Sequence, residues 1–304
     1  MNIYNLFLKM KQSLWMINQI NQTTHKVLFN QKKSLLEQNI LYNNNKGITL
    51  EKYCNHNIIV SLTTYGKRIY DVHLAIESIM EQTMKANKII LWLEYDFEKT
   101  HLPLFLQKLK EKGLEIYYCK NLYSYKKLIP TLKLFPNDAI ITIDDDLIYE
   151  PDLLERLISN YINNPSYIYC SRQHKMRLNK NGKLLPYLKW EWQSTNSEID
   201  IMNFPTGGAG TLYPPNSLDK EVFNESVFMD ICKYADDVWF KAMAIKKGTL
   251  SKKIYTHNPT GEDYIEIENV QDIGLKNINV TGEALNDKQI HDVFTKYNLY
   301  KLLK

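Results

Sequence analysis

The sequence predicts an α/β protein built on a mainly parallel β-sheet. From Asn57 onward, short apolar runs alternate with segments that have apolar residues at helical spacing, which is the pattern of βαβ units. The 304 residues are 44% hydrophobic and 24% charged. That is enough apolar material for one large or two small domains, and it excludes a disordered chain.

Five strands are expected, each a run of four or five mostly apolar residues. β-Branched and aromatic side chains, which favour strands, occupy most positions of these runs. The runs are residues 58–62, 89–93, 114–118, 139–143 and 167–170. Ligands of parallel sheets bind beyond the carboxyl ends of the strands, so the residues that follow each run are the first candidates for chemistry.

Helices are expected between the strands. Val72, Ile76 and Ile79 lie at helical spacing. Pro103 and Gly113 bracket a second helix, because Pro suits the first turn of a helix and Gly suits its end. Further helices are expected over residues 125–135, 151–163 and 236–247, the last with Gly248 as its C′ residue.

The N-terminal segment differs from the rest, being rich in Asn, Gln and Lys and without Pro. Its apolar residues Ile3, Phe7, Met10, Leu14 and Ile17 have the spacing of an amphipathic helix. The simplest interpretation is a helix docked on its own domain, with a membrane-surface or oligomerising helix as alternatives. The expected division is an N-terminal segment 1–53, a catalytic domain 54–260 and a C-terminal extension 261–304.

The composition indicates the cellular compartment of the protein and argues against one class of partner. The four cysteines lie far apart without a C-x-x-C pair, which favours a reduced cytoplasmic protein. No apolar run approaches the roughly 18 residues of a membrane span, and the first ten residues do not resemble a secretory signal. A net charge of +4 is too small to indicate a nucleic-acid partner.

The most informative string is Asp144-Asp145-Asp146, directly after a predicted strand. Adjacent carboxylates repel one another, so a fold that gathers them usually supplies a cation. Alternate residues of an extended segment point the same way, so Asp144 and Asp146 are expected to face one pocket and Asp145 to face elsewhere. Oxygen ligands suit Mg²⁺ or Mn²⁺ shared with a phosphate. The alternative is a solvated acidic turn before the next helix.

Other phosphate and carboxylate motifs do not fit. There is no G-x-x-x-x-G-K-[ST] string and no G-x-G-x-x-G after the first strand, which excludes a P-loop and argues against a dinucleotide fingerprint. A haloacid-dehalogenase motif would follow the first strand and have Thr or Val where Ile148 stands. A prenyl-diphosphate synthase would have its aspartates on a helix.

The order of features resembles the GT-A glycosyltransferases, and most of all family-2-like bacterial enzymes. The resemblance covers about residues 57–250. It depends on the polar loop after the first strand, on Glu94 after the second, and on the D-x-D string after the fourth. A Gly-rich loop at residues 205–210 and the acidic pair Asp236-Asp237 follow in the family's order. Their alternatives are a loop that needs positive φ and an ordinary Asp N-cap.

This resemblance implies a metal-dependent, inverting transfer of a sugar from a nucleotide-sugar donor, with a UDP-sugar favoured. Mn²⁺ or Mg²⁺ would be held by Asp146 and Asp144, with His257 as a third ligand. Asp237, or else Asp236, would deprotonate the acceptor hydroxyl. The acceptor would be a glycan or glycolipid in bacterial surface polysaccharide biosynthesis.

The resemblance also assigns binding residues. Those implied around the donor are Thr63, Tyr65, Arg68, Glu94, Lys127, Asp144 and Asp145. Those proposed for the acceptor or its sugar are Trp190, Trp192, Gly207 and Gly208. Each has an ordinary alternative: a capping Thr, a surface Arg, a solvated Lys, a core Trp or a structural His.

Two other functional classes remain open. A nucleotidyltransferase or phosphohydrolase would use the same carboxylates, and a catalytically silent protein would only bind glycans. Residues 1–56 contain seven Lys and two Glu, beside the amphipathic repeat. This favours a peripheral contact with anionic lipid on the inner face of the cytoplasmic membrane.

Overall fold

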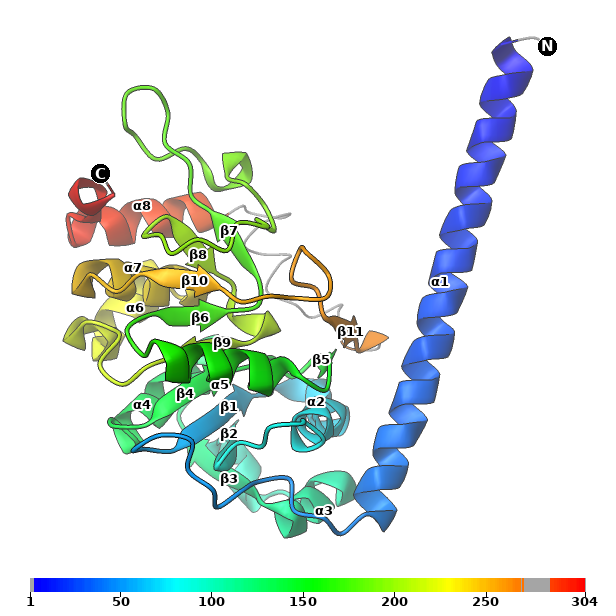
Figure 1. Ribbon diagram of the computed structural model, residues 1–304. Coiled ribbons are helices and arrows are strands. Elements are labelled where there is room, and N and C mark those ends of the chain that lie inside the picture. Colours follow the sequence, from blue (N-terminus) through cyan, green and yellow to red (C-terminus); the bar gives the residue numbers. More distant parts are fainter. Residues whose placement is uncertain (1–2, 269, 271–284, 304) are drawn as a thin grey trace.

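Seven strands form the central sheet of the computed structural model, which describes residues 3–268, 270 and 285–303. Figure 1 shows the sheet with helices around it, and the predicted α/β class is confirmed. In spatial order the strands are β10 (Ser251–Lys253), β6 (Ile168–Cys170), β9 (Thr211–Tyr213), β4 (Ala139–Thr142), β1 (Ile58–Thr63), β2 (Lys88–Glu94) and β3 (Leu114–Cys119).

The sheet is mainly parallel. β1 pairs in parallel with β2 and β4, β2 with β3, and β10 with β6, whereas β9 runs antiparallel between β4 and β6. All five predicted strands are present. β9 and β10 were not predicted, because three-residue strands are too short to show a periodicity. Two small sheets pair β5 (Leu147–Tyr149) with β11 (Tyr264–Glu266) and β7 (Gln173–Lys175) with β8 (Asn203–Pro205).

Most predicted helices occur with the expected ends. They are α2 (Val72–Met80), α3 (Leu104–Lys112), α5 (Leu153–Asn163) and α7 (Asp236–Lys247). Gly113 and Gly248 end α3 and α7 with φ of +116° and +84°, which glycine adopts without a Cβ penalty. The segment 125–135 is shorter than predicted. Only α4 (Ile129–Leu134) is α-helical there, because Pro130 has no amide hydrogen to extend a preceding turn.

The sheet separates two apolar cores. One contains Ile141 of β4 with side chains of α2, α3 and α5. The other contains Ile140, on the opposite face of β4, with side chains of α4, α6 (Glu225–Ile231), α7 and α8 (Asn286–Lys296). Successive residues of a strand point to opposite faces, so β4 is covered on both sides. This explains why its sequence is apolar throughout rather than alternating.

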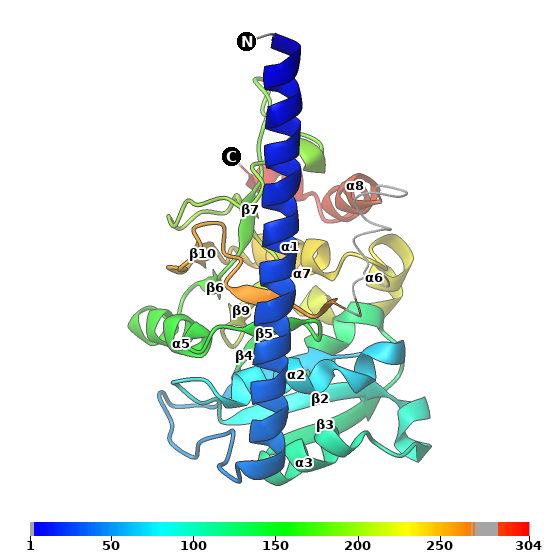
Figure 2. The same ribbon diagram turned by 90° about the vertical axis from the view of Figure 1, so that its right-hand side faces the viewer.

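The N-terminal segment forms one long helix, α1 (Ile3–Tyr42), and only its second half docks. Phe29, Leu36 and Ile40 are buried against the body. In Figure 1 the first half stands away from the body, and Phe7 and Leu14 are 53% and 58% exposed. Figure 2 looks onto α1, which runs in front of the body with its N-terminal end beyond it. The prediction that the amphipathic repeat docks on the chain's own domain is therefore wrong for its exposed residues from Phe7 to Ile17. Only the later turns of α1, from about Phe29, pack against the domain. No helix of the described residues is long and apolar enough to cross a membrane.

The described part of the segment 261–304 packs against the rest of the chain. β11 pairs with β5, and Val293 and Phe294 of α8 are buried in the core that contains α7. Residues 1–2 of the predicted N-terminal segment and residues 269, 271–284 and 304 of the predicted C-terminal extension lie outside the described residues.

Candidate functional site

Several of the predicted site residues, among them Arg68, Lys127 and the three aspartates at 144–146, come together at the carboxyl ends of β1 and β4. Successive parallel strands are added on one side of β1 as far as β3, and the chain then returns to place β4 on the other side. The order therefore reverses between β1 and β4. A crevice at such a switch point is where open α/β sheets bind ligands. The loop after β1 and the three aspartates after β4 border it.

Arg68 holds two of the three aspartates. Its Nη1 lies 2.7 Å from Asp145 Oδ1 and 3.0 Å from Asp146 Oδ2. Thr64 donates to the other oxygen of Asp145 at 2.6 Å. Arg68 and Asp145 are both buried. The structure thus places Asp145 in the interior rather than against a donor, and Arg68 on carboxylates rather than on a phosphate.

Lys127 joins the third aspartate to the acidic pair at the start of α7. Its Nζ lies 3.0 Å from Asp144 Oδ1 and 3.0 Å from Asp236 Oδ2. Ser124 donates to Asp236 Oδ1 at 2.8 Å. Lys127 is buried, so it is the counterion of both carboxylates rather than a solvated lysine.

The Gly-rich loop closes over these groups. The backbone N–H of Gly207 donates to Asp237 Oδ1 at 3.0 Å. A Cβ on Gly208 would overlap the carboxylate of Asp144, so only glycine permits this approach. The Tyr149 hydroxyl accepts from the Asp144 N–H at 2.8 Å and donates to the Gly208 carbonyl at 2.5 Å. Tyr149 therefore holds the aspartates and the loop together.

Burial and charge give these carboxylates different acidities. Burial alone would raise the pKa of Asp144, but Lys127 lowers it below the ordinary value. The pKa of Asp146 rises to about 7 because of burial and the charge of Asp144. Burial and the neighbouring Asp236 raise the pKa of Asp237 to about 7 as well. Carboxylates perturbed in this way, in a crevice, are typical of functional sites.

The donor set fits a divalent cation that shares its ligands with a phosphate. No group of three or more His, Cys, Asp or Glu side chains within the described residues is arranged to hold a metal. Asp144 and Asp146 supply two carboxylates, and Mg²⁺ sites commonly use one or two carboxylates completed by substrate phosphates and water.

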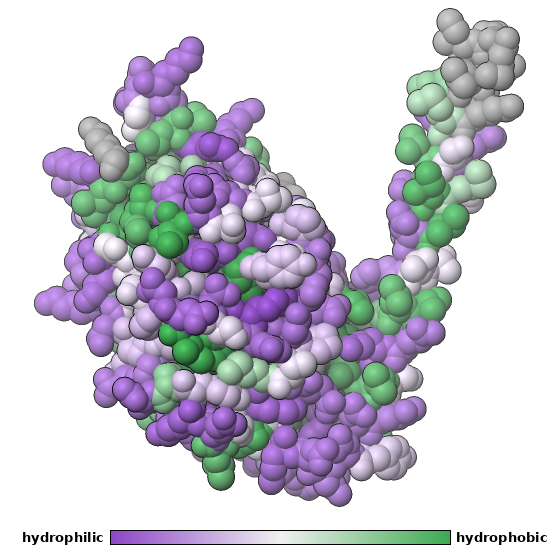
Figure 3. All heavy atoms as spheres, viewed as in Figure 1, coloured by the Kyte–Doolittle hydropathy of each residue, from purple (hydrophilic) through white to green (hydrophobic). Residues whose placement is uncertain are grey.

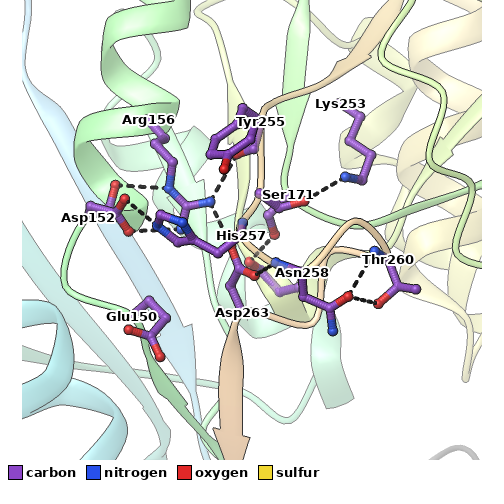
Figure 4. Close-up of polar contacts among 12 residues, drawn as sticks. Glu150, Asp152, Arg156, Ser171, Lys253, Tyr255, His257, Asn258, Thr260 and Asp263 are labelled. Atoms are coloured by element: carbon purple, nitrogen blue, oxygen red, sulfur yellow. Dashed lines mark hydrogen bonds and ion pairs between the residues drawn. The ribbon is translucent and has the colours of Figure 1, made fainter.

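His257 lies in a different cluster, which Figure 4 shows. Its Nε2 lies 2.8 Å from Asp152 Oδ2, at the start of α5. Arg156 pairs with the same Asp152 at 3.0 Å and with Asp263 at 2.8 Å. Asp263 accepts the backbone N–H of His257 at 2.8 Å. These contacts attach the loop before β11 to α5 and do not bring His257 to Asp144 and Asp146.

The other residues implied around the donor lie at the edge of the crevice. The Thr63 hydroxyl donates to the Trp92 carbonyl at 2.9 Å, so it ties the end of β1 to the neighbouring strand β2. Glu94 pairs with buried Lys126 at 2.6 Å. Tyr65 is 38% exposed, with the Arg68 guanidinium 5.3 Å from the centre of its ring. Tyr65 therefore presents an aromatic ring that a ligand can reach.

The two tryptophans have different environments. Trp190 is buried, and its Nε1 donates to the Leu185 carbonyl at 2.8 Å. It is therefore a core residue and not a platform for a sugar, since its ring packs on Tyr187 and Phe204. Trp192 is 39% exposed, with its ring 4.6 Å from that of His174.

Four residues of the site were not predicted. Thr64, Ser124 and Tyr149 act through contacts with residues distant in sequence, and no local pattern marks them. Lys241 could have been found from the sequence. It lies four positions after Asp237, and the other residues from 238 to 245 are apolar. It is buried.

Comparisons with known proteins identify no family. No family model matches the chain, and no curated protein matches it. Two similar solved structures are those of S. aureus TarS 1-349, alone and in complex with UDP. Their identities are 15% and 14% and their TM-scores 0.43 and 0.42. Each alignment covers 66% of this chain and 58% of that chain, less than two thirds of the TarS chain.

Proposed function

We propose that this chain is a glycosyltransferase that moves a sugar from a nucleotide-sugar donor, a UDP-sugar in the favoured case. The acceptor would be a glycan or glycolipid of a bacterial surface polysaccharide. One observation supports this most strongly. The aspartates after β4 and the acidic pair of α7 are joined by Lys127 beneath the Gly-rich loop, at the switch point of the sheet.

The proposed cofactor is Mn²⁺ or Mg²⁺, held by Asp144 and Asp146. When bound, such an ion stabilises the negative charge that develops on the departing nucleoside diphosphate. Arg68 keeps Asp145 and Asp146 in place, at 2.7 and 3.0 Å. Lys127 does the same for Asp144 at 3.0 Å. The chain thus orients the carboxylates before any ligand arrives, which is the preorganisation that an electrostatic site needs.

Asp237 is the proposed general base, in keeping with inversion at the anomeric carbon. Its Oδ1 accepts from the Gly207 N–H, which fixes the orientation of the carboxylate beneath the Gly-rich loop. A pKa of about 7 suits a base that works near neutral pH. Asp236 is occupied by Lys127 and Ser124, which leaves Asp237 as the better candidate of the pair.

For the donor and the acceptor we propose Tyr65 and Trp192. Tyr65 would stack on the base of the nucleotide, and Trp192 would present its ring to the apolar face of a sugar. Both rings are more than a third exposed. Gly207 and Gly208 would bring the backbone close to the transferred sugar, since neither has a side chain to exclude it.

The test combines donor binding with turnover. A panel of UDP-, GDP- and CDP-sugars is screened by thermal shift with and without Mn²⁺ or Mg²⁺, and consumption of the donor is followed with glycan acceptors. We expect Asp146→Ala to lose the metal-dependent shift. Asp237→Asn should keep the shift and lose turnover by about 10²–10⁴-fold. The control is Asp230→Asn, an exposed aspartate on α6.

The outcomes separate the functional classes. Release of free phosphate or of a nucleoside monophosphate without sugar transfer would indicate a phosphohydrolase or a nucleotidyltransferase. If no nucleotide sugar is consumed or raises the melting temperature, the proposal is wrong.

We further propose that the first half of α1 contacts anionic lipid on the inner face of the cytoplasmic membrane. Met10, Leu14, Trp15, Ile17 and Ile20 are each at least half exposed, and apolar side chains are visible on this free part of the helix in Figure 3. The charged residues of positions 3–36 are all lysines. An all-cationic helix complements an anionic surface and repels a second copy of itself.

Vesicle co-sedimentation of the full chain tests this contact. We expect binding to vesicles with anionic lipid and not to neutral ones, and a loss of binding in Leu14→Gln/Trp15→Gln. The control is Leu50→Gln, which is 95% exposed outside the helix. Unchanged binding in the double variant contradicts the proposal. Dissociation of a dimer by the double variant, without an effect on vesicle binding, would assign α1 to a second copy of this chain.

A further inference from the structure

Lys241 and Asp237 line the same small cavity. They lie four residues apart in α7 and therefore on one face of the helix. Tyr213 of β9 and Ser251 of β10 contribute to the lining, and the cavity volume is about 10 Å³. That volume holds about one water molecule, which needs two to four polar partners.

Two polar groups of this cavity lack a protein partner. Neither Lys241 Nζ nor Ser251 Oγ has a hydrogen-bond partner within the described part of the chain. Lys241 is only 3% exposed. Lysine is almost never buried unless it is paired, and buried polar groups are nearly always bonded to protein or ordered water. The ammonium therefore needs a counter-charge and a hydrogen-bond acceptor that the direct contacts do not supply.

The acidic groups around Lys241 leave one candidate for that counter-charge. Cys170 on β6 and Asp200 in the loop before β8 both act on Lys241 electrostatically. Burial raises the pKa of the Cys170 thiol to about 12, so it is neutral. Asp200 pairs with Lys175 at 2.9 Å. Asp237 is the carboxylate that lines the cavity itself.

We propose that Lys241 is a positioning residue for Asp237, which it keeps ionised through one water molecule in this shared cavity. The water accepts from Lys241 Nζ, donates to the Asp237 carboxylate and bonds to Ser251 Oγ, and so satisfies the two groups without a protein partner. The inference rests on the proposed function, because it assumes that the ionised Asp237 is the general base. Besides burial, Asp236 and Asp144 also act on Asp237 and raise its pKa, whereas Lys127 lowers it. Lys241 would be a second cation beside the same carboxylate, linked to it by the water in the cavity that both side chains line.

Titration of Asp237 in the full-length chain tests the proposal without any turnover. The side-chain carboxyl ¹³C resonance of Asp237 is assigned by its absence in Asp237→Asn and is followed from pH 4 to pH 9. Removing the ammonium in Lys241→Met should raise the apparent pKa of Asp237 by about one unit, since a nearby opposite charge favours the ionised form. Lys247→Met, at an exposed lysine of the same helix, should leave it unchanged.

Kinetics then distinguish positioning from a structural role. In Lys241→Met the acid limb of the kcat/KM profile should move to higher pH by the same amount, with KM for the donor unchanged. A loss of activity that is equal at all pH values would indicate a structural role and overturn the proposal. So would an unshifted Asp237 resonance.

A variant that does not fold does not end the test. Lys241→Gln keeps a hydrogen-bond donor without the charge and gives the same comparison. If the wild-type chain transfers no sugar while the Asp237 resonance still shifts, the proposed function fails and the link between Lys241 and Asp237 stands.

Discussion

At the residue scale, the site consists of buried and partly exposed charges that hold one another in place. Lys127 lies between Asp144 and Asp236, and Arg68 lies between Asp145 and Asp146. Removing one partner of a buried pair leaves the other uncompensated and typically costs about 3–5 kcal/mol. The stability of this region and the orientation of the proposed catalytic groups therefore depend on the same residues.

Asp237 should make folding stability depend on pH in a direction that a surface carboxylate would not. Its pKa in the folded chain is about 7, above the ordinary value near 4. Its contribution to stability is therefore complete below about pH 4 and is lost as the pH rises through 7. We expect Asp237→Asn to become more stable relative to the wild type between pH 5 and pH 8, as measured by urea unfolding.

The comparison with a second aspartate isolates this effect. Asp230→Asn, on the exposed side of α6, should differ from the wild type by the same amount at both pH values. If Asp237→Asn instead becomes less stable relative to the wild type as the pH rises, Asp237 ionises more easily in the folded chain than in the unfolded one, and the prediction is wrong.

At the element scale, the turn between β4 and β5 and the Gly-rich loop before β9 form one unit. The Tyr149 hydroxyl bonds to the backbone of both segments. β9 runs antiparallel beside β4, and this direction brings the loop at its start to the carboxyl end of β4. The antiparallel strand is therefore the reason that the glycines meet the aspartates.

Gly208→Ala should damage the site and leave the rest of the fold intact. The added methyl group would overlap the Asp144 carboxylate, so the loop or the aspartate must move. Overpacking of this kind costs about 1–3 kcal/mol, and we expect donor affinity to fall by at least about tenfold, measured by thermal shift or calorimetry. In Gly182→Ala, where nothing lies within 4 Å of the new methyl group, donor affinity should be normal.

At the scale of the whole molecule, the C-terminal segment supports α7, the helix that begins with Asp236 and Asp237. α8 packs on α7, and Phe294, Trp239 and Val293 share one core. Residues near the end of the chain thus fix the position of Asp236 and Asp237 at the start of α7. The free half of α1 contributes nothing to this core and presents its apolar side chains to the surroundings (Figure 3).

Phe294→Ala should therefore destabilise the chain by about 3–5 kcal/mol, the usual cost of truncating a buried Phe, as measured by denaturant unfolding. Phe294 is 1% exposed. Leu302→Ala, at a residue that is 49% exposed in the same segment, should change stability by less than about 1 kcal/mol. Equal effects of the two variants would mean that the packing of α8 in the core does not contribute to stability.

The fold was predictable where local patterns are strong. The five predicted strands and most helices follow from runs and spacings within about ten residues, as does the end of α7 at Gly248. α1 was only partly predicted. Its amphipathic spacing indicates a helix, but spacing alone does not say whether a partner covers the apolar face, and here the first half has none within the described residues.

The sequence by itself determined the α/β class and the two acidic strings, because hydrophobic periodicity and strand-end position are local properties. Only the tertiary structure decided how those strings are used. It turned Arg68 and Asp145 inward, separated His257 from Asp144 and Asp146, and buried Trp190. Ser124 and Asp236, 112 residues apart, meet at 2.8 Å. Such contacts arise from strand order and direction, which no local pattern specifies.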